Sequence, residues 1–249
     1  MRLFNFLSFC TVCFLSTSAM AETLTIAVAS NFAKPIKEIA KRYEKQTQNT
    51  VRLSFGSSGK IYAQIKNGAP FDIFLSADQS KPEALEKEGY IIDGSRFTYA
   101  TGRLVLWSGN PELVDGKGNV LKINKYRKLA IANPKLAPYG RAASEVLSAL
   151  KLSGTAQPKL IIGENISQTY QFVGTGNAEI GFIAYSQIFH KGNVKNGSVW
   201  IVPAALHSPI KQDAVILKRG KSKAASRFID FLRESEAKTI IESYGYQTE

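Results

Sequence analysis

Two groups of small polar residues in the first quarter of the chain could bind an anion. Ser30 and Asn31 follow the apolar run LTIAVA, and Gly56-Ser57-Ser58-Gly59 follows the run TVRLSF. Apolar residues recur at helical spacing after each group, so each group lies where a strand ends and a helix begins. The first N–H groups of a helix have no intrahelical partner and carry partial positive charge, which favours an anion. A serine that only caps a helix, or a plain Gly-Ser turn, would give the same local pattern.

The residues needed for catalysis form no recognisable set. A nucleophilic serine needs a base, but the only histidines, His190 and His207, lie in no triad context, and no serine lies in a G-x-S-x-G motif. The stretch from Gly56 to Lys60 is too short for a phosphate-binding P-loop, and Ile61 stands where that loop requires Ser or Thr. We therefore do not expect an enzyme, and a serine-dependent hydrolase is the less favoured alternative to a binding protein.

Ligands for a protein-bound metal or cofactor are also few. Cys10 and Cys13 are the only cysteines and both lie in the N-terminal segment, so the rest of the chain has no disulfide or thiolate site. Asp72, Asp78 and Glu164 are candidate carboxylates, but a place in a buried strand explains Asp72 and a helix cap explains Asp78. We expect no cofactor and no direct protein–metal ligand.

Residues 1–21 predict a secretory signal peptide. Arg2 is the only charge before Glu22, Leu3 to Leu15 is mostly apolar, and Ala19-Met20-Ala21 matches an A-x-A cleavage site. The apolar run is too short to remain as a membrane anchor. We expect cleavage after Ala21 and a mature protein in the periplasm.

The formal net charge of +12 favours an anionic partner, which could be a small anion, a membrane surface or a nucleic acid. The basic residues are scattered and mixed with acidic ones, as in KEIAKRYEK, and the aromatic residues lie within apolar patterns. A nucleic-acid partner is therefore not expected. Lys60 and Arg141 each follow a candidate turn, and we interpret both chiefly as parts of solvated helix faces.

The order of the elements predicts an α/β fold. Strands and helices alternate as β-α-β-α-β-α over the first part of the mature chain, which calls for a parallel sheet covered by helices on both faces. In such sheets ligands bind at the carboxyl ends of the strands, where Ser30 and the Ser57-Ser58 pair both lie. A second block repeats this order, with turns at Tyr139 and Ile166.

The chain resembles the periplasmic molybdate-binding proteins of ATP-driven (ABC) transporters, which belong to the type II periplasmic solute-binding proteins. The segments that carry the resemblance are AVASNFAKPIKEIAKRYEKQT, SFGSSGKIYAQIKNGAPFDIFLSADQ, NPKLAPYGRAASEVL, AEIGFIAYSQ and FIDFLRESEAKTIIESYGY. The resemblance implies two lobes, each a mainly parallel sheet flanked by helices, joined by a hinge that is crossed twice. Lobe one would comprise residues 22–101 and 211–249, and lobe two residues 102–210.

The resemblance also implies the site. Ser30 and Ser58 would each bind a tetrahedral oxyanion through the hydroxyl and the backbone N–H, whereas Tyr139 and Ile166 would each supply a backbone N–H. Ser57 would be adjacent and less direct. Some family members add a tyrosine hydroxyl, but Ala184 aligns with that position and Tyr185 lies one residue further on. A step of one residue points to the opposite face of a strand, so Tyr185 reaches the ligand only if a bulge intervenes. Ala184 and Tyr185 are therefore additional candidate positions for a fifth contact.

The implied function is capture of molybdate or tungstate by neutral hydrogen-bond donors and delivery to a membrane permease. We expect a monomer. A binding protein for sulfate, phosphate or chromate is the alternative within the same class.

Overall fold

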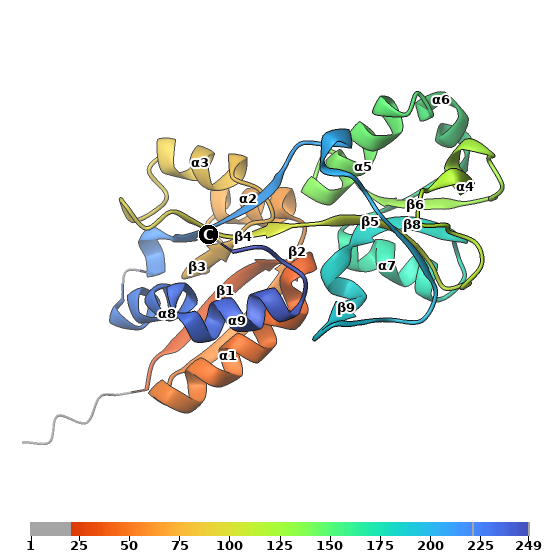
Figure 1. Ribbon diagram of the computed structural model, residues 1–249. Helices are drawn as coiled ribbons and strands as arrows, with labels where there is room; N and C mark the ends of the chain where they lie inside the picture. The colour runs from red at the N-terminus through yellow and green to blue at the C-terminus, as the bar shows by residue number, and fades with distance from the viewer. Residues whose placement is uncertain (1–20, 221, 249) are drawn as a thin grey trace, which may run out of the picture.

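The structure is a computed structural model that describes residues 21–220 and 222–248, so most of the predicted signal peptide lies outside it. The chain forms two lobes side by side, each built on a five-stranded sheet with helices on both faces (Figure 1). We call the lobe with the N-terminal sheet lobe one and the other lobe two. No helix among the described residues is long and apolar enough to cross a membrane.

The sheet of lobe one has the strand order β2-β1-β3-β12-β4. β1 pairs in parallel with β2 and β3, whereas β12 runs antiparallel to β3 and β4. The strands span Thr23–Ala29 (β1), Thr50–Gly56 (β2), Ile73–Leu75 (β3), Phe97–Gly102 (β4) and Ile210–Ile216 (β12).

Helices cover both faces of this sheet. Helices α1, α8 and α9 contribute to one apolar cluster and α2 and α3 to another. In α1, Ile36, Ile39 and Tyr43 are fully buried, as their helical spacing predicted. The elements span Ser30–Phe32 (η1), Ala33–Thr47 (α1), Ser58–Lys66 (α2), Ser80–Lys87 (α3), Lys218–Gly220 (η5), Lys223–Arg233 (α8) and Ser235–Ser243 (α9).

The sheet of lobe two has the order β11-β5-β8-β6-β7. β6 pairs in parallel with β7 and β8, whereas β5 is antiparallel to β8 and β11. The strands span Leu104–Ser108 (β5), Leu129–Ala132 (β6), Leu160–Gly163 (β7), Ile180–Ala184 (β8) and Ser198–Ile201 (β11), and Phe189–His190 (β9) pairs with Asn193–Val194 (β10) apart from this sheet.

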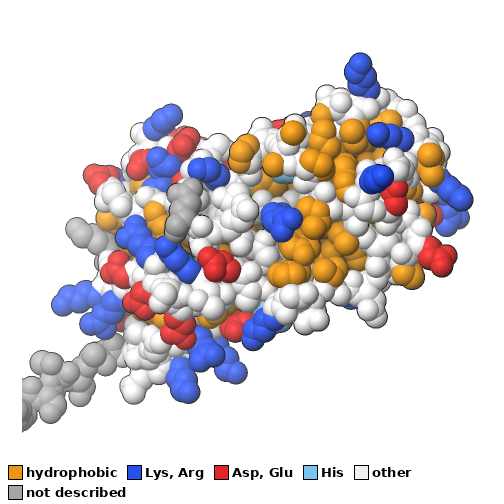
Figure 2. Space-filling view, viewed as in Figure 1, with side chains coloured by type: hydrophobic (Ala, Val, Ile, Leu, Met, Phe, Trp, Pro, Cys, Tyr) orange, Lys and Arg blue, Asp and Glu red, His pale blue; other side chains and the backbone are white. Residues whose placement is uncertain are grey.

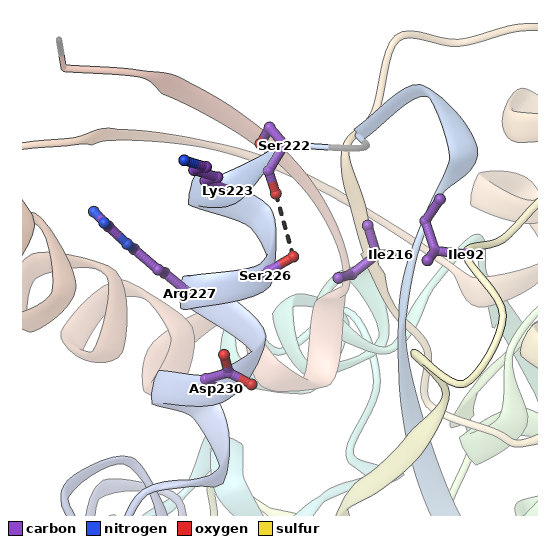
Figure 3. A pocket seen from close by; sticks show the side chains of 7 residues that line it. All are labelled: Ile92, Ile216, Ser222, Lys223, Ser226, Arg227 and Asp230. Atoms are coloured by element: carbon purple, nitrogen blue, oxygen red, sulfur yellow. Dashed lines mark hydrogen bonds between the residues drawn. The ribbon is translucent and has the colours of Figure 1, made fainter. Parts of the chain in front are cut away.

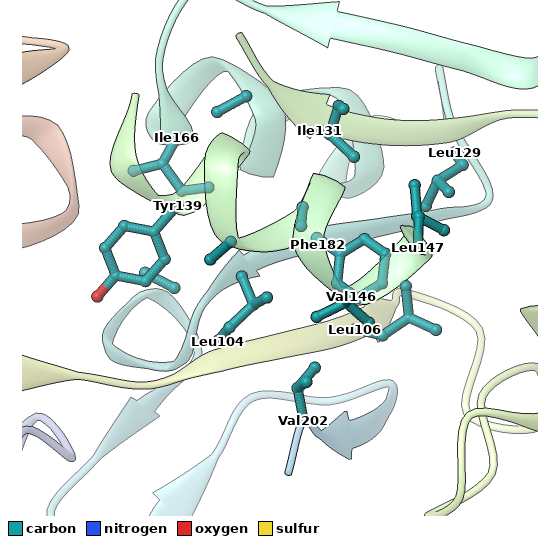
Figure 4. Packing of buried hydrophobic residues seen from close by; sticks show 14 of the residues in the cluster. Leu104, Leu106, Leu129, Ile131, Tyr139, Val146, Leu147, Ile166, Phe182 and Val202 are labelled. Atoms are coloured by element: carbon teal, nitrogen blue, oxygen red, sulfur yellow. The ribbon is translucent and has the colours of Figure 1, made fainter. Parts of the chain in front are cut away.

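The core of lobe two lies between its sheet and helix α5, and α7 covers the other face. Figure 4 shows this packing, with Tyr139 and Ile166 at one end of the cluster. The helical elements span Asn119–Lys122 (α4), Pro138–Ala149 (α5), Ser153–Ala156 (α6), Gln157–Lys159 (η2), Ile166–Gly174 (α7), Tyr185–Gln187 (η3) and Ala204–Leu206 (η4).

Two strands connect the lobes. β4 ends at Gly102 and β5 begins at Leu104, while β12 begins at Ile210 on the return path. Within lobe one, the C-terminal tail pairs with β4 beside this connection, through two backbone hydrogen bonds of 2.8 and 3.1 Å between Gln247 and Thr101. The division into residues 22–101 with 211–249 and residues 102–210 remains our proposal.

The predicted two-lobed α/β class is confirmed, but both sheets are mixed. The antiparallel strands are β12, which returns from lobe two, and β5, which pairs antiparallel with both β8 and β11. A sequence pattern reports which segments are strands, whereas their direction depends on the path of the whole chain.

Candidate anion-binding site

The register of the lobe-one sheet brings the two serine turns together. β1 and β2 are parallel, and Ala29 at the end of β1 pairs with Gly56 at the end of β2. Ser30 and Ser57 therefore leave the same sheet edge on neighbouring strands. In lobe two, Ala132 pairs in the same way with Gly163, which places the turns before Tyr139 and Ile166 at one edge.

A small cavity lies between these edges. Its lining residues come from both lobes and carry no charged side chain; they are Ala29, Ser30, Asn31, Gly56, Ser57, Ser58, Ala77, Ala137, Pro138, Tyr139 and Ile166. The space open to the centre of a water-sized sphere is about 10 Å³. That is room for about one water molecule, far less than an organic cofactor occupies.

The four residues predicted as main contacts all line this cavity. Ser58 and Ile166 are the first residues of α2 and α7, Tyr139 is the second residue of α5, and Ser30 opens the short helix η1. The first N–H groups of three α-helices therefore converge on the cavity, and a partial positive charge accompanies each helix start. The arrangement favours an anion without using a charged side chain.

The two neighbouring serines differ in their hydrogen bonds. The Oγ atom of Ser58 accepts a bond of 2.9 Å from the backbone N–H of Ala77. Ser57 is the cap residue of α2, yet its side chain accepts no capping hydrogen bond. Its Oγ atom is buried and has no hydrogen-bond partner among the residues that the structure describes. An unpaired buried hydroxyl is costly, so this one is suited to a bound ligand.

Ser30 contacts the opposite lobe as well as the cavity. Its Oγ atom lies 3.3 Å from Oδ1 of Asn165, and its carbonyl oxygen accepts a bond of 3.2 Å from the hydroxyl of Ser167. Asn165 also caps α7, because its Oδ1 accepts from the N–H groups of Ser167 and Gln168. The cap uses the second and third residues of the helix and not Ile166, which lines the cavity.

Ala184 and Tyr185, the predicted additional positions, do not line the cavity. Ala184 ends β8 and donates its backbone N–H to the side chain of Gln187 at 3.0 Å. The ring of Tyr185 stacks on Phe189 with ring centroids 4.7 Å apart, and the guanidinium of Arg103 lies 5.0 Å from the Tyr185 ring centroid. Gly245 of the C-terminal tail packs on the same ring, since a Cβ there would lie 2.6 Å from it, so these contacts hold the side chain of Tyr185 outside the cavity lining.

Two ion pairs join the lobes, formed by residues close in sequence to those that line the cavity. Lys60 Nζ lies 2.6 Å from Oε1 of Glu164, and Arg141 Nη2 lies 3.5 Å from Oδ2 of Asp78. The interpretation of Lys60 and Arg141 as solvated helix faces is therefore incomplete. Both are half exposed, but each also meets a carboxylate of the other lobe, which reduces its effect on the cavity.

The other candidate residues lie outside the cavity lining. Asp72 was expected in a buried strand, but it lies half-buried directly before β3, where its carboxylate accepts a bond of 2.7 Å from the backbone N–H of Thr25. The ring of His190 packs on Tyr244, and Nδ1 of His207 lies 2.7 Å from the carbonyl oxygen of Ser208. The described residues contain no group of three or more His, Cys, Asp or Glu that could hold a metal ion.

A larger cavity of about 550 Å³ lies on lobe one beside the start of α8, lined by Ile92, Ile216, Ser222, Lys223, Ser226, Arg227 and Asp230 (Figure 3). It contains none of the predicted contacts. The hydroxyls of Ser222 and Ser226 are already bonded within the helix. We therefore place the candidate site between the lobes.

The sequence also left some functional positions unassigned. Asn31 lines the cavity. Gly59 donates its backbone N–H across the lobes to the carbonyl oxygen of Leu136 at 2.9 Å. The position of Asn31 directly after a strand end was a signal that could have identified it. The role of Gly59 depends on a contact between distant segments, which no local sequence pattern reports.

A fold with two hinged α/β lobes and a small neutral cavity between them is typical of a solute-binding protein. The chain belongs to the family of bacterial extracellular solute-binding proteins, whose profile matches residues 24–247.

Within this family it is similar to curated proteins over nearly its whole length. It is 52% identical over 233 residues to the molybdate-binding protein ModA of Azotobacter vinelandii, covering 93% of this chain and 92% of the relative. It is 51% identical over 236 residues to ModA of Rhodobacter capsulatus, covering 94% and 92%.

The solved structure of the Azotobacter vinelandii periplasmic molybdate-binding protein superimposes with a TM-score of 0.88 at 42% identity, covering 91% of this chain and 99% of that one. The resemblance to periplasmic molybdate-binding proteins noted in the sequence is confirmed.

Proposed function

We propose that the chain is an extracytoplasmic solute-binding protein that captures molybdate in the cavity between its lobes and delivers it to an ABC permease. Tungstate, which has nearly the same size and charge, binds in the same way. The observation that carries the proposal is the cavity wall, where three helix N-termini and the hydroxyls of Ser30, Ser57 and Ser58 meet without a charged side chain.

The cavity supplies what a dehydrated dianion needs. An oxyanion that enters it loses its hydration shell, which is a large free-energy cost. Fixed N–H and O–H donors replace that shell, and hydrogen bonds to a charged acceptor are stronger than those between neutral groups. Neutral donors leave discrimination to the size of the anion, and a protonated oxyanion would place a donor against a donor.

We assign the contacts as follows. Ser30 and Ser58 bind through the hydroxyl and the backbone N–H, and Tyr139 and Ile166 bind through the backbone N–H. Ser57 supplies a fifth contact through its hydroxyl, which is supported by the lack of a partner for that atom in the described part of the chain. Ala184 and Tyr185 are not part of the assigned site.

The same proposal covers the biological context. The protein acts in the periplasm as a monomer after cleavage behind Ala21, and it binds its ligand without chemical change. No cofactor takes part, and the oxyanion reaches the protein through oxygen atoms only, without a direct bond from the protein to molybdenum.

Isothermal titration calorimetry of the mature protein with molybdate, tungstate, sulfate, phosphate and chromate tests the proposal. We expect tight binding of molybdate and tungstate and weak or no binding of the other three. Tight sulfate or phosphate binding without molybdate heat would overturn the ligand assignment. Absence of heat with all five anions would overturn the site.

A further inference from the structure

Gln212 is a fully buried polar residue on β12, close to the strand connection between the lobes. The register of β12 against β4 shifts between Gln212 and Asp213, which marks a β-bulge. A bulge re-aims side chains relative to a regular strand. Both side chains are completely buried here, and Asp213 pairs with Arg96 at 2.9 Å while Gln212 faces a different group of residues.

The amide of Gln212 joins the two walls of the anion cavity. Its Oε1 accepts a bond of 2.8 Å from Nδ2 of Asn31, which lines the cavity from lobe one. Its Nε2 donates at 3.3 Å to the phenol oxygen of Tyr139, which lines the cavity from lobe two. Gln212 itself does not line the cavity, so it reaches the ligand only through these two residues.

The backbone of Asn31 is hydrogen-bonded to residues of both lobes. Its carbonyl oxygen accepts bonds from the hydroxyls of Tyr246 at 2.9 Å and Ser186 at 3.0 Å. Tyr246 and Ser186 are themselves 3.0 Å apart through their hydroxyl oxygens. All these groups are buried. The network is neutral, since burial raises the pKa of the Tyr246 phenol to about 12 and raises the pKa of Tyr139 as well.

The backbone that connects the lobes packs closely against the hydrogen bond between Gln212 and Tyr139. A Cβ atom on Gly102, the last residue of β4, would lie 2.1 Å from the phenol oxygen of Tyr139 and 2.6 Å from Nε2 of Gln212. These atoms therefore pack directly on the strand that crosses between the lobes. In Figure 4 the hydroxyl of Tyr139 points away from the apolar cluster of lobe two, as this contact requires.

Separation of the lobes would break the bond between Gln212 and Tyr139 and leave a buried amide donor without a partner. An unpaired buried donor is unfavourable, so the bond favours the conformation in which the lobes meet around the ligand. We propose that Gln212 is a positioning residue that fixes the cavity-lining residues Asn31 and Tyr139 in place and slows release of the oxyanion by holding the lobes together. This inference rests on the proposed function.

Stopped-flow binding of molybdate to the mature protein tests it, with Gln212→Met, Tyr139→Phe and the double variant. Tyr139→Phe removes one oxygen atom and keeps the backbone N–H assigned to the ligand. We expect each single variant to raise the dissociation rate constant about threefold to tenfold, with little change in the association rate constant. The double variant should be no worse than the more affected single variant, because both remove the same bond.

Tyr99→Phe is the matched control. Its hydroxyl lies 3.0 Å from the same Oε1 of Gln212, but the contact is within lobe one, so the dissociation rate constant should not change. Dissociation rate constants equal to that of the unmodified protein in both single variants, or a double variant whose effect is the product of the two, would overturn the inference. If Gln212→Met does not fold, Tyr139→Phe alone decides.

The two proposals fail in different ways. Absence of molybdate binding by the unmodified protein overturns the proposed function and, with it, this inference. Molybdate binding by the unmodified protein, combined with unchanged release from both single variants, overturns the role of Gln212 alone.

Discussion

The hydroxyl oxygen of Ser58 accepts a hydrogen bond of 2.9 Å from the backbone N–H of Ala77, and both residues line the cavity between the lobes. A serine hydroxyl has a single hydrogen, and this bond occupies only a lone pair of the oxygen. The hydrogen of Ser58 therefore remains to donate to an oxyanion. In the proposed site, one atom thus connects two segments of lobe one and donates to the ligand.

Ser58→Ala should affect both binding and stability. Loss of a hydrogen bond to a charged ligand should weaken molybdate binding by about 1.5–3 kcal/mol. The buried N–H of Ala77 would also lose its partner, which should lower the free energy of unfolding of the ligand-free protein by about 1–3 kcal/mol. Calorimetry and urea unfolding measure the two effects. An unchanged affinity would mean that the anion binds elsewhere.

Ser57→Ala should separate these effects. Within residues 21–220 and 222–248 the Ser57 hydroxyl has no partner, so its removal leaves none of their donors or acceptors unpaired. We expect the free energy of unfolding without ligand to stay the same or rise, while molybdate affinity falls about threefold to a hundredfold. Comparison with Ser58→Ala under the same conditions provides the control. Wild-type affinity would show that this hydroxyl does not contact the ligand.

Gly59→Ala should hinder contact between the lobes. Its Cβ would lie 3.0 Å from the Cα and carbonyl oxygen of Leu136, at the point where Gly59 donates its backbone N–H to that carbonyl. We expect about tenfold weaker molybdate binding, or about 1.4 kcal/mol. Alanine is the better helix former, so the ligand-free protein should not lose stability. Gly109→Ala, where a Cβ meets no atom within 4 Å, is the control and should bind as the unmodified protein does.

Tyr246 should make stability depend on alkaline pH. Burial raises the pKa of its phenol to about 12, whereas an unfolded chain releases this proton near pH 10. The stabilisation is therefore fully present below about pH 10 and is lost as the pH rises toward about 12, by up to about 3 kcal/mol. Urea unfolding at about pH 9 and about pH 11.5 measures the loss. Tyr246→Phe should show a smaller loss, and an equal loss would assign it to other groups.

The local sequence pattern predicted the parts of the site in which a turn follows the end of a strand. The strand before Ser30, the strand before Ser57 and the helices after them are all present, because alternation and helical spacing are properties of neighbouring residues. The parallel order of elements also predicted that both turns share a sheet edge. The pairing of Ala29 with Gly56 is the register that this prediction required.

Contacts between distant segments could not be predicted in this way. Two adjacent serines in one turn look alike in sequence, and only the position of Ala77 shows that Ser58 is bonded and Ser57 is not. The pairing of Lys60 with Glu164 joins residues 104 positions apart. The surface agrees better with the sequence interpretation, because Figure 2 shows basic and acidic side chains interspersed over lobe one. On the same face, apolar side chains gather over lobe two.

The neutral wall of the cavity has a consequence for the loaded protein as a whole. No Asp, Glu, Lys, Arg or His lines the cavity to take up or release a proton when the ligand binds, so the complex should differ from the free protein by the full charge of the bound oxyanion. Loading would then lower the net positive charge in a single step and slow migration toward the cathode in native electrophoresis. The intensities of the two bands, one for the free and one for the loaded protein, would then give the occupied fraction without a label or a chromophore.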